Sequence, residues 1–108
     1  MVDAVFNERQ SLRLRCRFTD AAGLPVEPEE IVVRVDNVDT GEPVVAPTVV
    51  ESPAAEVFVL ITRDQNALQS PTVQKERRLV TVDFSYDGGA QGAPVQYAYT
   101  LRNLRFVP

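Results

Sequence analysis

The most regular hydrophobic pattern of the chain lies close to its N-terminus. Between Ser11 and Thr19, an apolar residue at every second position alternates with Arg13, Arg15 and Arg17. Successive side chains of a β-strand point to opposite faces, so a period of two indicates a strand that is buried on one face. This segment is predicted to be a half-buried strand with an apolar face and a guanidinium face.

The alternation returns in residues 31–37, with apolar side chains at odd positions, and in residues 78–86, with apolar side chains at even positions. Residues 57–62 are almost wholly apolar, which predicts a strand covered on both faces. Pro47 separates two short valine-rich stretches, and prolines are typical of sheet edges and turns. We therefore expect two short strands here, at residues 44–45 and 48–50.

The C-terminal part of the chain reads as a hairpin that follows a long connection. Residues 63–76 are polar and predict a long connection, a candidate for a mobile or partner-ordered loop with one helical turn at residues 64–68. Asp87, Gly88 and Gly89 open a glycine-rich hairpin loop that is expected to close at Pro94. The last apolar alternation, over residues 95–107, changes phase near Asn103, where we expect a bulge or a corner.

Short strands with turn signals every 8–12 residues are typical of a β-sandwich. At 108 residues the chain is predicted to be a single domain, residues 1–108, of the all-β class: an immunoglobulin-like antiparallel β-sandwich of about seven strands. Residues 1–10 are candidates for an extended N-terminal arm that pairs with the edge of a neighbour's sheet.

Charge and cysteine content narrow the function classes. A net charge of −4 argues against nucleic acid as a partner, because binding to nucleic acid depends on neutralising phosphates. The single cysteine, Cys16, cannot form an internal disulfide, which favours folding in a reducing cytosol. Neither a signal peptide nor a membrane-spanning apolar run is present in the sequence, so no membrane partner is expected.

Candidate catalytic chemistry is sparse. The chain contains no histidine, which removes the usual general base and the commonest zinc ligand, so we expect no enzyme activity, no cofactor and no metal. Asp36, Asp39 and Glu42 are close in sequence, but their spacing matches no calcium loop. Cys16 falls on the apolar phase of its strand, where a small buried side chain is expected.

The arginines at 13, 15 and 17 are the strongest candidates for an interaction surface, because three guanidinium groups on one face attract carboxylates. The sequence allows two kinds of partner for these arginines. The arginines pair with acids of their own sheet, such as Asp36 or Asp83, or they meet the acidic middle segment of a neighbouring molecule. The candidate protein-interaction residues are Arg13, Arg15, Arg17, Glu27, Glu29, Glu30, Gly88 and Gly89.

Residues 6–28 combine the alternating strand, an Asp/Gly turn and the step Pro-Val-Glu-Pro, and the valine-rich segment 31–35 follows. This pattern resembles small structural proteins of tailed-bacteriophage virions, and residues 78–87 and 97–104 look like the closing strands of such domains. The resemblance implies an immunoglobulin-like virion protein that serves as a capsid decoration, a neck or collar piece, or a tail or fibre adaptor. It also implies assembly in the bacterial host cytoplasm, with other virion proteins and copies of this chain as partners.

The alternative from another class is a carbohydrate- or cell-surface-binding β-sandwich, which normally presents exposed aromatic rings. Tyr86, Tyr97 and Tyr99 fall on apolar strand phases, where core packing is expected. A third class, an accessory domain of a cytosolic enzyme, normally carries a linker, and the sequence shows none.

Overall fold

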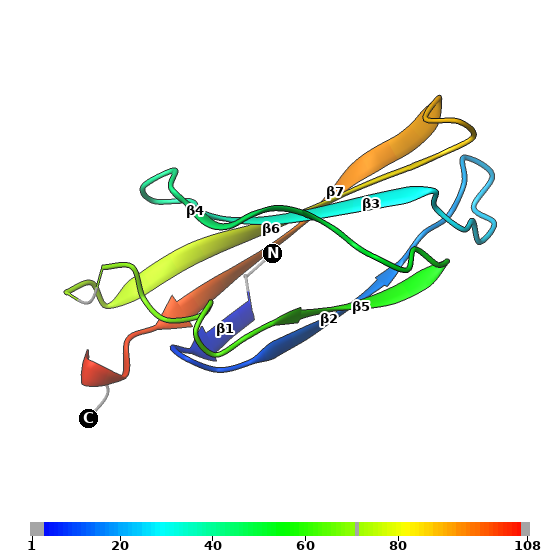
Figure 1. Ribbon diagram of the computed structural model, residues 1–108. Coiled ribbons are helices and arrows are strands. Elements are labelled where there is room, and N and C mark those ends of the chain that lie inside the picture. The colour runs from blue at the N-terminus through cyan, green and yellow to red at the C-terminus, as the bar shows by residue number, and fades with distance from the viewer. Residues whose placement is uncertain (1–3, 71, 107–108) are drawn as a thin grey trace.

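The computed structural model describes residues 4–70 and 72–106, and strands dominate them (Figure 1). The strands and the short 3-10 helix η1 are β1 (Ala4–Asn7), β2 (Leu12–Arg17), β3 (Glu30–Asn37), β4 (Pro43–Val49), β5 (Glu56–Ile61), β6 (Lys75–Tyr86), β7 (Gln91–Arg102) and η1 (Leu104–Phe106). No α-helix forms in this part of the chain, so the predicted all-β class is confirmed.

The strands form two sheets of unequal width. The larger sheet has five strands in the order β1-β7-β6-β3-β4, and the smaller sheet consists of β2 and β5. All pairings are antiparallel except that of β1 with β7, which is parallel. Figure 1 shows the two sheets as facing layers, with the pair β2–β5 against the larger sheet. Two facing sheets are consistent with a sandwich.

The core lies between these layers and is supplied by the predicted alternation. Inward residues of β3 and β6 are buried, and Phe18, just after β2, packs on Phe84 of β6 with ring centroids 4.7 Å apart. The buried apolar residues are Leu12, Phe18, Ile31, Val33, Val35, Val57, Ile61, Val80, Val82, Phe84, Tyr99 and Leu101. Burying such side chains is the main driving force for folding.

Two predicted features of the middle segment are corrected. Residues 43–49 form one edge strand, β4, instead of two short strands, and its register against β3 shifts twice, which accommodates the prolines at this edge. The prediction that β5 is covered on both faces is wrong: Phe58 and Leu60 on its outer face are 50% and 61% exposed. No other element lies over that face in the described part of the chain.

The N-terminal segment forms part of the protein's own sheet. Ala4–Asn7 is the parallel edge strand β1, whose Phe6 lies opposite Leu101 of β7 and contacts Tyr99 edge-on at 6.1 Å between ring centroids. This part of the predicted arm is therefore docked on its own molecule. The first three residues of the arm lie outside the described residues.

The C-terminal hairpin is tighter and longer than predicted. β7 begins at Gln91, directly after the turn, so Pro94 is within the strand opposite Asp83 and does not close the loop. The change of phase near Asn103 is the end of β7, because Arg102 is the last paired residue and η1 follows, so of the two expected alternatives the bulge does not form.

The connection between β5 and β6 is anchored. It begins with a turn in which the Asn66 amide donates to the Thr62 carbonyl at 3.0 Å, close to the predicted helical turn. Glu76 at the start of β6 accepts hydrogen bonds from the amides of Gln69 and Ser70 at 3.0 and 3.2 Å. Buried polar side chains therefore hold residues 62–70 against the sheet.

Candidate functional site

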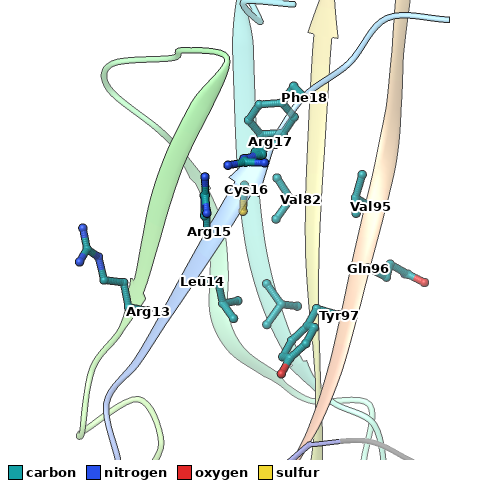
Figure 2. A pocket seen from close by; sticks show the side chains of 11 residues that line it. Arg13, Leu14, Arg15, Cys16, Arg17, Phe18, Val82, Val95, Gln96 and Tyr97 are labelled. Atoms are coloured by element: carbon teal, nitrogen blue, oxygen red, sulfur yellow. The ribbon is translucent and has the colours of Figure 1, made fainter. Parts of the chain in front are cut away.

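The two sheets differ in width, and this difference leaves an apolar cleft at the side of the narrow sheet. The two-stranded sheet lies over the middle of the larger one, and the first half of β7 extends past it with its side chains exposed. The space between β2 and β7 has a volume of about 430 Å³. Its apolar walls are Leu14, Cys16, Val80, Val82, Val95 and Tyr97. In Figure 2, Leu14 and Cys16 point from β2 toward Val82 and Tyr97, whereas Arg13 and Gln96 point away.

The β2 edge that borders this cleft has no neighbouring strand among the described residues. The amide of Phe18 donates to the carbonyl of Ala55 at 2.9 Å, which sets the phase of the antiparallel ladder between β2 and β5. Hydrogen-bonded pairs alternate along such a ladder, so the main-chain groups of Arg13, Arg15 and Arg17 point to the open side. The cleft thus has an apolar floor and a border of unpaired main-chain groups.

The arginine side chains lie on the opposite face of β2, in solvent. Arg15 and Arg17 both pair with Glu56 of β5, at 3.2 and 3.0 Å, and Arg13 lies over the ring of Phe58 at 3.9 Å from its centroid. Two of these arginines therefore pair within their own sheet, as one of the two hypotheses predicts, but with Glu56. The acids named in that hypothesis lie in the other sheet, where Asp36 pairs with Arg34.

Two of the other predicted interaction residues, Glu29 and Gly88, are in contact at one end of the molecule. The carboxylate of Glu29, just before β3, accepts a hydrogen bond from the Gly88 amide in the β6–β7 turn at 3.0 Å. Glu27, Glu30 and Gly89 are exposed nearby in sequence. The three glutamates and two glycines do not line the cleft. The predicted interaction residues therefore form two separate groups, one on the arginine face of β2 and one around the Glu29–Gly88 contact.

Cys16 and the tyrosines differ in exposure. Cys16 is half-buried in the cleft, and burial raises the pKa of its thiol. Tyr99 is fully buried and Tyr86 half-buried, as expected for core residues, but Tyr97 is 39% exposed on the wall of the cleft. Of the three tyrosines, Tyr97 therefore presents an accessible ring where the sequence pattern predicts core packing.

A second, smaller cleft of about 280 Å³ lies on the other side of the narrow sheet, between β5 and β4. Val45, Val49 and Leu60 are among its lining residues. It exists for the same reason as the first cleft, since the wide sheet extends past the narrow one on both sides. Pro43 and Pro47 lie on the β4 edge, where they limit pairing with another strand.

Sequence reasoning missed a buried ion pair. Arg78 and Glu76 are neighbours on the inward face of β6, and their side chains are 0% and 2% exposed. Arg78 also donates to the carbonyls of Gln65 and Ala67 at 2.8 and 2.9 Å. Every buried side-chain polar atom in the described residues has a partner, so this network has a structural role in holding the 62–70 segment. The sequence does contain a signal for this pair, because Glu76 and Arg78 lie at the same alternate positions of β6 as its buried apolar residues.

No group of three or more His, Cys, Asp or Glu side chains is placed to hold a metal ion within residues 4–70 and 72–106. Asp36 is paired with Arg34, and Asp39 accepts a hydrogen bond from the Arg77 amide at 3.2 Å. The described residues also contain no helix that is long and apolar enough to cross a membrane.

Comparisons with protein-family models, with curated proteins and with solved structures find no match to this chain.

Proposed function

We propose that this protein is a non-enzymatic β-sandwich of the immunoglobulin type that acts by binding other proteins, as a structural component of a bacteriophage virion. The observation that carries the binding role is the cleft between β2 and β7, where an apolar floor meets an unpaired strand edge. Monomeric soluble proteins seldom leave such surfaces uncovered unless something binds there.

The strand order supports the immunoglobulin type. In immunoglobulin domains the third, sixth and seventh strands are neighbours in one sheet, and the second and fifth are neighbours in the other. Here β7, β6 and β3 are consecutive in the wide sheet, and β2 pairs with β5. The constant type places its first strand beside the second and its fourth beside the fifth. In this chain β1 joins β7 and β4 joins β3, so no strand among the described residues occupies either position, and the two clefts are beside them.

The virion assignment rests on the resemblance in residues 6–28 and 31–35, which fall on β1, β2 and β3. Its test is quantitative mass spectrometry of gradient-purified phage particles, with the copy number scaled to the major capsid protein. Hundreds of copies would support a capsid decoration, and a few to a few dozen would support a neck, tail or fibre position. Absence from every particle fraction would contradict the virion assignment.

Carbohydrate binding is the second candidate, because Tyr97 presents an accessible ring on the wall of the cleft. Glycans commonly stack on such rings. Under this hypothesis Tyr97→Ala abolishes binding on a glycan array while the thermal unfolding midpoint stays near that of the unmodified protein. Binding that is unchanged in Tyr97→Ala, or that is absent from the array altogether, would contradict it.

A further inference from the structure

We propose that the open edge of β2 binds an extended segment of a partner protein in which apolar and acidic residues alternate. The segment would add a third strand to the narrow sheet, with its apolar side chains in the cleft and its carboxylates beside the arginines. This inference rests on the proposed protein-binding function and names the chemistry of the partner.

The first argument comes from the main chain. β2 has six residues, and its open side presents the amides and carbonyls of Arg13, Arg15 and Arg17. Adding a strand to such an edge satisfies these groups, and this is a common mode of peptide recognition. By contrast, the edge of β4 contains Pro43 and Pro47, which lack amide protons.

The second argument comes from the cleft floor. A strand beside β2 places every second side chain on the same face as Leu14 and Cys16, over Val82 and Tyr97. That floor is mostly apolar, so apolar side chains at these positions remove exposed surface from water at a gain of about 25 cal/mol per Å². Polar side chains there would be desolvated without partners.

The third argument comes from charge. The other side chains of the added strand lie beside Arg13, Arg15 and Arg17, on the outer face of the narrow sheet. Arg15 and Arg17 share one acid, Glu56, and Arg13 has no ion-pair partner among the described residues. Opposite charges on neighbouring strands stabilise the pairing by about 0.2–1 kcal/mol per pair. The outward positions of the partner strand are therefore expected to be acidic.

A second copy of this chain fits the edge poorly. Pairing β2 with β2 of another molecule would place the arginines of one copy opposite those of the other, and like charges facing each other destabilise a sheet. The charge pattern consequently disfavours β2 of a second copy as the added strand.

The test uses a capped peptide, Val-Glu-Val-Asp-Val-Glu-Val, with amide hydrogen exchange of the full chain followed by NMR. We expect slower exchange at Arg13, Arg15 and Arg17 on binding, while Leu14 and Cys16, whose amides already face β5, change little. A peptide of the same composition without alternation, and one with lysine in place of each acid, are the controls and should give no protection.

A charge-swap variant tests the arginine contacts. Arg13→Glu should weaken binding of the acidic peptide by about three- to tenfold, and a peptide with one lysine opposite position 13 should restore it. Arg34→Glu, at another exposed arginine but on the wide sheet, is the control and should leave the affinity unchanged.

A disulfide provides an independent position marker. Neighbouring residues at non-hydrogen-bonded positions have Cα atoms about 4.5 Å apart, within the range that a disulfide requires. A peptide whose central inward cysteine is activated as a mixed disulfide with thionitrobenzoate should therefore cross-link to Cys16 at mildly alkaline pH, where the Cys16 thiolate displaces thionitrobenzoate, and should be released by reductant. Cysteine at the adjacent outward position should not cross-link.

Protection at the three arginine amides, together with rescue of Arg13→Glu, would support the proposal. Protection elsewhere, or none up to the solubility limit of the peptide, would overturn it, as would self-association of the free chain through β2. Cross-linking mass spectrometry of intact particles tests the proposed protein-binding function independently of strand addition. Contacts with other virion proteins away from β2 would leave the proposed function standing while strand addition fails.

Discussion

The hydroxyl of Tyr99 donates a 2.7 Å hydrogen bond to Oδ1 of Asn66, a residue 33 positions earlier in the chain. Asn66 also donates from Nδ2 to the Gln10 carbonyl at 2.6 Å, and its own carbonyl accepts from the Arg9 amide at 2.9 Å. A single buried side chain thus connects β7, the crossover from β1 to β2 and the turn after β5. These bonds close one end of the molecule.

Asn66→Ala is expected to lower the free energy of unfolding by about 2–4 kcal/mol, because it leaves the Tyr99 hydroxyl and the Gln10 carbonyl without partners in a buried site. Tyr99→Phe should cost about 1–2 kcal/mol. Urea denaturation of both variants and of the double variant measures their coupling. We expect a coupling energy above about 0.5 kcal/mol, and strictly additive costs would contradict the direct bond.

Stability at alkaline pH should depend on Tyr99. Burial raises the pKa of this hydroxyl from 10.0 to about 12, so the unfolded chain loses the proton at lower pH than the folded protein does. The free energy of unfolding should consequently fall between about pH 10 and pH 12, by up to about 3 kcal/mol.

Denaturation of the unmodified protein and of Tyr99→Phe at a series of pH values isolates this contribution, since other groups titrate in both. The stability advantage of the unmodified protein should shrink as pH rises from about 10 to about 12. A constant difference between the two proteins would show that Tyr99 is not shielded from ionisation.

Glu76→Ala should be strongly destabilising, by about 3–5 kcal/mol, because Arg78 would remain charged and buried without its carboxylate. Asp36→Ala is a matched control. It breaks an ion pair of the same spacing on β3, with an arginine that is half exposed, and should cost about 1 kcal/mol or less. Thermal or urea unfolding compares the two variants. Similar costs would mean that the Glu76–Arg78 pair is accessible to water.

Gly92→Ala should disturb the β6–β7 hairpin. Gly92 has φ of +150° and lies opposite Ser85, and a Cβ atom there would overlap the carbonyl oxygen of Phe84. We expect a loss of more than about 2 kcal/mol in the free energy of unfolding. Gly41→Ala, at φ of +76° with no atom within 4 Å of the added Cβ, should cost about 1–2 kcal/mol. A cost at Gly92 no larger than that at Gly41 would contradict the close approach.

Local pattern predicted β2, β3 and β6 well, because each has one apolar and one polar face and the period of two is visible in a few residues. It failed where burial depends on distant partners. Phe58 and Leu60 are apolar but exposed, since no third layer built from residues 4–70 and 72–106 covers the narrow sheet. Glu76 and Arg78 are charged but buried, since the 62–70 segment supplies their hydrogen bonds.

The sequence by itself determined the all-β class, the main strands, the apolar faces and the alternation that puts three arginines on one side of β2. Tertiary structure decided which strands became neighbours. With β1 paired to β7 and β4 to β3, the narrow sheet has two strands, and the edge of β2 is open beside an apolar cleft. An alternating pattern specifies which face of a strand is buried, but not which strand lies beside it, because strand pairing depends on contacts between residues far apart in the chain.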